Sequence, residues 1–65
     1  MRNELFSQAK SFVQQAVMIA NGFEDGDQEK AVSRAKNAVS SAYANSTDAE
    51  RQQLHQFQDQ LEKLQ

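Results

Sequence analysis

Two segments of the chain carry a serine three residues before a lysine, the spacing of a known nucleophilic motif. Ser7 and Lys10 form the first S-x-x-K pair, and Ser33 and Lys36 form the second. In penicillin-binding proteins the serine of such a pair is the nucleophile. That chemistry also needs further motifs and a cavity that excludes water, which three short helices can hardly enclose. We therefore interpret both pairs as solvated helix surface and predict that the protein is not an enzyme.

Four acidic side chains surround Gly26 and raise the question of a calcium site. They are Glu24, Asp25, Asp27 and Glu29. An EF-hand loop places oxygen ligands at alternating positions over twelve residues and ends in a glutamate, and this segment does not supply that pattern. Carboxylates also gather at the first turn of a helix, where the helix dipole favours negative charge. We therefore predict the start of a helix here and no metal site.

His55 is the only histidine, and the chain has no cysteine. Structural zinc sites are built from several His and Cys side chains, so a single histidine cannot form one unaided. His55 lies beside a row of apolar residues, which predicts a half-exposed side chain of minor structural weight. The sequence implies no cofactor.

The bulk composition limits the class of protein. Sixty-five residues predict one domain, residues 1–65, with a small core and modest stability. Nine acidic and seven basic residues are mixed along the chain and give a net charge of −2. The chain has no cysteine for disulfides and no apolar run of membrane-spanning length, and the residues MRNELF lack the apolar stretch of a secretory signal. We expect a soluble, cytoplasmic protein that does not enter a membrane.

Two polar segments divide the chain into three parts. Residues 21–27 read NGFEDGD and contain both glycines, and residues 44–50 read ANSTDAE. The intervening patterns predict helices over about residues 3–21, 28–44 and 48–64.

Residues with special capping roles flank these connections. Gly22 can adopt the left-handed conformation that closes the first helix. Asp27 is placed to cap the second helix. Thr47 and Glu50 form the spacing of a capping box for the third, with Ser46 as a competing cap.

Each predicted helix has one apolar side when successive residues are placed 100° apart. On the first helix this side comprises Leu5, Phe6, Ala9, Phe12, Val13, Ala16, Val17, Ile19 and Ala20. The second centres on Ala31, Ala35, Ala38 and Ala42, with Val32, Val39 and Tyr43 at one edge. The third has the narrow seam Leu54, Phe57, Leu61 and Leu64. Three such helices predict an all-α fold, a small antiparallel three-helix bundle.

The first two helices share a sequence frame at an offset of 26 residues. Residues 7–17 read SQAKSFVQQAV and residues 33–43 read SRAKNAVSSAY, with five of eleven positions identical. Phe12 corresponds to Ala38 in this alignment, so a bulky face opposes an alanine face. Alanine leaves room for phenylalanine in a close antiparallel contact. We interpret the frame as a shared solution to packing and predict that Phe12 and Ala38 are neighbours.

The segment AKNAVSSAYANSTDAERQQLHQFQDQLEKLQ, residues 35–65, resembles a family of short proteins from Bacillus and related Firmicutes. The similarity extends through QAKSFVQQAV near the N-terminus and so covers most of the chain. The ANST turn and the glutamine-rich helix after it are its most distinctive part. The family is a domain of unknown function, so the resemblance implies a small cytoplasmic bacterial protein with no assigned activity, cofactor or catalytic residue.

Our first hypothesis for function is a non-enzymatic module that binds an unknown protein partner or a second copy of itself. The candidate patch for this contact is Leu5, Phe6, Met18 and Phe23, which lie at the end, at the edge or outside the apolar side of the first helix. The placement of Met18 away from the centre of that side predicts an exposed side chain. The seam of the third helix either closes its own bundle or pairs with another chain in a homodimer.

The alternative is a small nucleic-acid-binding regulator that uses Lys30, Arg34 and Lys36. A phosphate-binding surface needs a concentrated basic face, and the net charge of this chain is negative. Residues 48–65, the recognition helix in a helix-turn-helix reading, carry more acidic than basic residues. Both features argue against a nucleic-acid partner.

Overall fold

Three α-helices are present in residues 4–64, the part of the chain that this computed structural model describes. They are α1 (Glu4–Ala20), α2 (Gln28–Tyr43) and α3 (Asp48–Lys63). Each observed end lies within one residue of its prediction, and predicted residue 3 falls outside the described residues. None of the three has both the length and the apolar content that crossing a bilayer requires.

Gly22 ends α1. Its φ of 81° lies in the left-handed region, which a glycine adopts without steric cost. The backbone N–H of Phe23 donates to the carbonyl of Met18 at 2.9 Å, and that of Gly22 donates to Ile19 at 3.1 Å. These two bonds form a Schellman motif and satisfy carbonyls that the helix end leaves open. The predicted role of Gly22 is confirmed.

The predicted N-caps of α2 and α3 are also confirmed. The Asp27 carboxylate accepts a hydrogen bond from the backbone N–H of Lys30 at 3.3 Å. The Thr47 hydroxyl accepts from the backbone N–H of Glu50 at 3.3 Å, and the Thr47 N–H donates to the Glu50 carboxylate at 2.9 Å. The reciprocal pair is a complete capping box.

Ser46 does not cap α3, in contrast to the competing possibility that the sequence offers. Its hydroxyl donates to the carbonyl of Ala42, one of the last carbonyls of α2. The Nε of Arg51 donates to the carbonyl of Tyr43 at 3.0 Å. Two side chains of the turn and of α3 thus satisfy the C-terminal end of α2.

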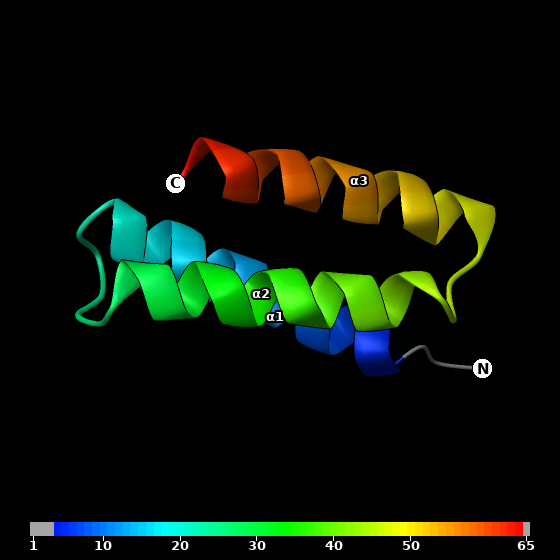
Figure 1. The fold of residues 1–65 in the computed structure, drawn as a ribbon, viewed down its shortest axis with the longest axis horizontal. Coiled ribbons are helices and arrows are strands. Elements are labelled where there is room, and N and C mark those ends of the chain that lie inside the picture. Colours follow the sequence, from blue (N-terminus) through cyan, green and yellow to red (C-terminus); the bar gives the residue numbers. More distant parts are fainter. Residues whose placement is uncertain (1–3, 65) are drawn as a thin grey trace.

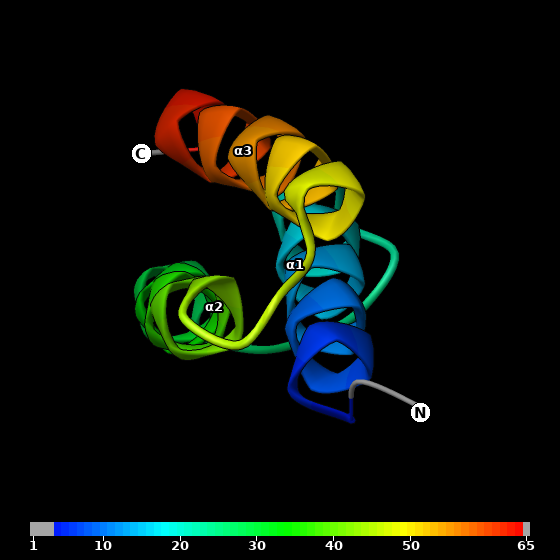
Figure 2. The same cartoon turned by 90° about the vertical axis from the view of Figure 1, so that its right-hand side faces the viewer.

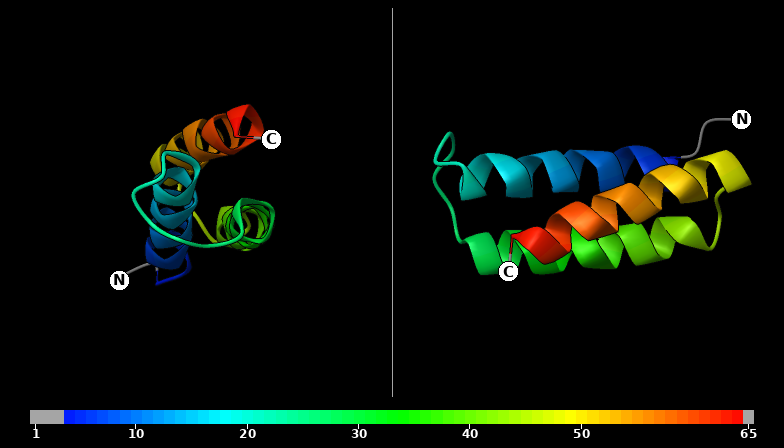
Figure 3. Two further views of the ribbon diagram at one scale, coloured as in Figure 1. Left: turned by 90° about the vertical axis from the view of Figure 1, so that its left-hand side faces the viewer. Right: turned by 90° about the horizontal axis from the view of Figure 1, so that it is seen from above.

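Each helix runs in the opposite direction to the one before it (Figure 1), so α1 and α2 are antiparallel neighbours. Helix α3 lies across one side of the α1–α2 pair (Figure 2), and the view from above shows it running obliquely over both helices (Figure 3). The C-terminal end of α3 therefore lies toward the same end of the bundle as the loop 21–27, and the start of α1 lies toward the opposite end (Figure 3). The predicted three-helix bundle is confirmed.

The core lies where the three helices meet. Its fully buried members are Ala9, Val13 and Ala16 of α1, Val32, Ala35, Val39 and Ala42 of α2, and Leu54 and Leu61 of α3. Helix α3 contributes the two largest of these side chains, and both have no exposed surface. Phe57 and Leu64, the other members of its seam, pack partly buried against the core. The seam of α3 thus closes its own bundle.

The apolar side of α2 is rotated from its predicted centre. Val32 and Val39 are buried, whereas Ala31 and Ala38 are only partly buried and Tyr43 is 40% exposed. The cause is α3. At the boundary between α2 and α3, Val32 lies near Leu64 and Val39 lies near His55. Two helices thus share the apolar side of α2, and the prediction that placed its valines at the edge is wrong. Phe12 and Ala38 both pack on the core, and their direct contact stays a prediction.

Replacement of Gly22 by alanine should destabilise the fold by about 1 kcal/mol, because an L-residue is strained at positive φ. Gly26→Ala is the matched control. A Cβ there would lie 2.9 Å from the terminal methyl of Ile19, which can turn aside. Urea denaturation measures the free energy of unfolding of both variants. An equal loss of stability in the two would contradict the role of Gly22 at the end of α1.

Replacement of Leu61 by alanine should cost about 2–5 kcal/mol, because it empties a fully buried site. That is comparable to the whole stability of a domain of this size, so cooperative thermal unfolding should disappear. Leu64→Ala, at the partly exposed end of the same seam, should retain a sigmoidal melt in circular dichroism. Cooperative melting of Leu61→Ala near the wild-type midpoint would contradict a core built on α3.

Candidate interaction surface

A groove between α1 and α3 is lined mainly by uncharged side chains. Its volume is about 380 Å³, and its lining residues are Val13, Gln14, Val17, Met18, Phe57 and Gln60. We call it the α1–α3 groove. None of these lining residues is ionisable, so a partner here would be held by apolar contact and amide hydrogen bonds.

Met18 stands at the rim of the α1–α3 groove. It is 44% exposed, as its position on the first helix predicts. Methionine is flexible and polarisable, and such side chains adapt to differently shaped partners. Phe57, on the other wall, is partly buried against the core. The groove therefore combines one fixed aromatic wall with one adaptable rim.

The four residues of the predicted patch do not form one continuous surface. Leu5 is 37% exposed, whereas the ring of Phe6 packs 6.3 Å from that of Phe57, centroid to centroid. Met18 and Phe23 lie at the other end of α1, about 20 Å away at 1.5 Å per residue. Phe23 is the most exposed of the four, at 79%. The structure thus separates the patch into two ends of α1.

A second apolar surface lies on the side of the α1–α2 pair away from α3. On α1 it comprises Leu5, Phe12 and Ile19, which repeat every seven residues, and on α2 it comprises Ala31 and Ala38. We call these five residues the heptad face. Helical geometry places Phe12 and Ile19 about 140–160° around α1 from Val17, which borders α3. A hollow of about 180 Å³ beside Ile19 and Ala31 is lined by α1, α2 and their loop.

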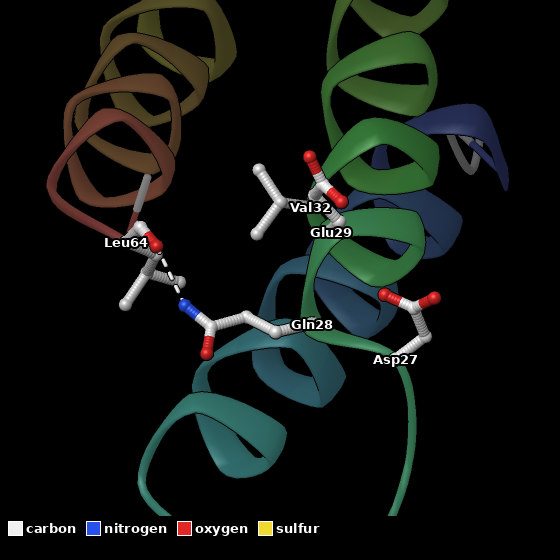
Figure 4. Close-up of a pocket in the computed structure, with 5 residues that line it drawn as sticks. All are labelled: Asp27, Gln28, Glu29, Val32 and Leu64. Atoms are coloured by element: carbon white, nitrogen blue, oxygen red, sulfur yellow. Dashed lines mark hydrogen bonds between the residues drawn. The ribbon is translucent and has the colours of Figure 1, made fainter.

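A cleft of about 420 Å³ separates the start of α2 from the end of α3 (Figure 4). Val32 and Leu64 line it from opposite helices, and the Gln28 side chain donates to the Leu64 carbonyl at 2.6 Å. The carboxylates of Asp27 and Glu29 point away from Leu64. Asp27 is also engaged as the helix cap. The two acidic groups therefore do not converge on a common point.

The S-x-x-K pairs lie on the bundle surface. Ser7, Lys10 and Ser33 are exposed and Lys36 is partly buried. Among residues 4–64 no cluster of three or more His, Cys, Asp or Glu side chains has a spacing that could hold a metal ion.

The three candidate phosphate-binding residues are split between two sides of α2. Lys30 and Arg34 lie one turn apart beside the hollow that Asp25 and Asp27 also line. Lys36 lies about 160° around the helix from Arg34. The basic groups are therefore neither gathered on one face nor separated from carboxylates.

A cluster that sequence reasoning missed joins Tyr43 of α2 to Arg51 and His55 of α3. The Arg51 guanidinium lies 4.9 Å from the centroid of the Tyr43 ring, within range of a cation–π contact. The His55 ring meets Tyr43 edge-on at 6.2 Å. The i, i+4 spacing of Arg51 and His55 was the available signal, because it places both on one side of α3.

The sequence matches, over residues 1–64, the model of the family described as "Protein of unknown function (DUF3813)". It is 86% identical to the "Uncharacterized protein YizC" of Bacillus subtilis (strain 168), over the whole of both chains. No solved structure gives a significant match. The chain belongs to this bacterial family, which confirms the resemblance seen in the sequence.

Met18→Gln should change the free energy of unfolding by no more than about 0.5 kcal/mol, because the side chain lies at the surface, 44% exposed, outside the core. Phe57→Ala, on the opposite wall of the α1–α3 groove, should cost about 3 kcal/mol because its ring packs on the core. Thermal unfolding followed by circular dichroism compares the two. A large loss in Met18→Gln would mean that this side chain serves the fold.

Proposed function

We propose that this protein is a non-enzymatic, cytoplasmic interaction module that binds another protein, or a second copy of itself, through apolar surfaces of α1. The observation that supports this most strongly is that α1 is apolar over more of its circumference than the bundle covers. Its buried stripe is flanked on one side by the α1–α3 groove and on the other by the heptad face. A helix needed only for the core would keep one apolar stripe.

The side chains on these surfaces suit protein recognition. Aromatic residues and methionine are enriched at protein interfaces, and charged residues are depleted from interface centres. Phe57 and Met18 border the α1–α3 groove, and Phe12 is central to the heptad face. Grooves between helices commonly accept an amphipathic partner helix with apolar anchors three or four residues apart. A partner of this chemistry is the one we propose.

No observation favours the nucleic-acid alternative over this one. Lys36 lies on a different side of α2 from Lys30 and Arg34, and Asp25 and Asp27 lie beside those two. A surface of this kind would not release the counterions that drive phosphate binding. We therefore do not propose nucleic acid as the main partner.

The test is affinity capture from a Bacillus subtilis lysate with the tagged full chain as bait. Wild type and Gln56→Lys, a change on the exposed outer side of α3, should enrich the same protein. Leu5 and Met18 lie on different surfaces of α1, so one of the two variants Leu5→Lys and Met18→Lys should reduce that enrichment at least about tenfold, because a charge would be buried in the contact. The proposal fails if no protein is enriched, or if all four baits enrich the same proteins equally.

A further inference from the structure

We propose that the heptad face is the contact between two copies of this chain, related by a twofold axis that runs parallel to the helices. This rests on the proposed function and names a second copy as the partner of that face. The contact would place α1 of one copy against α2 of the other.

The heptad face is the side of the α1–α2 pair that the chain leaves without a covering helix. Helix α3 lies across the opposite side (Figure 2). Leu5 is 37% exposed, and Phe12, Ile19, Ala31 and Ala38 are all only partly buried. The α1–α2 pair thus has one side covered by a helix and one apolar side without a covering helix, where the loop 21–27 packs only on the Ile19 end.

The face is complementary to a copy of itself. Leu5, Phe12 and Ile19 form a ridge of large side chains on α1, and Ala31 and Ala38 form a low shelf on α2. Members of both rows repeat every seven residues, about 10.5 Å along a helix. A twofold axis parallel to the helices sets each ridge against the shelf of the other copy, so large side chains meet small ones twice. An axis perpendicular to the helices would set ridge on ridge and shelf on shelf.

The basic residues of α2 favour the same axis. Lys30 and Arg34 border the shelf on α2 and are exposed. The parallel axis brings them opposite the flank of the partner's α1, which carries Gln8 and Gln15 and, at its far end, the acidic Glu4. The perpendicular axis would bring α2 against α2, with the two copies of Arg34 close to each other. Like charges in an interface oppose association.

The area of the heptad face matches a pair of partner helices better than a single partner helix. Helix α1 has 17 residues and is about 26 Å long, and two packed helices span about 20 Å in width. The resulting footprint of about 500 Å² approaches the roughly 800 Å² per partner of a standard interface. One foreign helix on the heptad face would cover about half of this footprint. A second α1–α2 pair covers it more fully, and the modest area indicates a weak, transient dimer.

Sedimentation analysis of the full chain from about 1 µM to about 1 mM tests the proposal. The experiment is run at high ionic strength, because the parallel axis brings the two acidic loops 21–27 to the same end. The average mass of wild type should rise from monomer toward dimer. Leu5→Lys should raise the dissociation constant at least about tenfold. Met18→Lys, on the same helix but in the α1–α3 groove, should leave it unchanged.

A wild-type chain that stays monomeric at the highest concentration overturns the proposal, as does loss of dimer in Met18→Lys but not in Leu5→Lys. Circular dichroism of each variant verifies that the helices are intact. A monomeric chain that still captures a foreign protein through Leu5 or Met18 would leave the proposed function standing without the dimer.

Disulfide trapping tests the axis, because the chain has no cysteine of its own. Gln8→Cys and Ser41→Cys place single thiols at exposed positions that the parallel axis brings opposite each other. In an equal mixture of the two variants under mild oxidation, the mixed disulfide should exceed both homodimeric disulfides. A predominance of either homodimeric disulfide overturns the arrangement of α1 on α2.

Discussion

The close antiparallel contact between α1 and α2 is the constraint on which the rest of the bundle depends. Alanines without exposed surface lie on both sides of it, Ala9 and Ala16 on α1 and Ala35 and Ala42 on α2. Small side chains let two helices approach closely, but they bury little apolar area themselves. The larger contributions must come from the flanks of the contact. Helix α3 supplies them on one flank through Leu54 and Leu61, and this explains why its narrow seam suffices.

The same constraint explains why α1 has large apolar side chains outside its contact with α2. Its large residues cannot enter the alanine-lined contact, so they occupy the two flanks. On one flank Phe6 meets Phe57 beneath α3. On the other flank Phe12 and Ile19 border α2 without a covering helix. The α1–α2 pair has two flanks, and α3 covers one of them. The other flank has no helix to cover it, and this asymmetry underlies the proposed role in binding.

Features set by local chemistry could be predicted from the sequence. Gly22, Asp27 and the Thr47–Glu50 pair act within one or two turns, so their roles depend only on nearby residues. The helices and their apolar sides followed from periodicity for the same reason. The orientation of α2 could not be predicted in detail, because Val32 and Val39 become central only once α3 lies beside them. The division of the patch between the two ends of α1 follows from helix length, and the contact of Phe6 with Phe57 depends on the path of α3.

The hydrogen bond from Gln28 to the Leu64 carbonyl has a consequence for how the bundle opens. The start of α3 is held by its capping box, by the bond from Arg51 and by the short turn to α2. In the described residues, its other end is held by the last leucines and by the Gln28 side-chain bond across the cleft between α2 and α3. Transient opening should therefore begin at the C-terminal turn and swing about the turn 44–47, with the backbone amides of residues 61–64 exchanging their protons before those near Leu54.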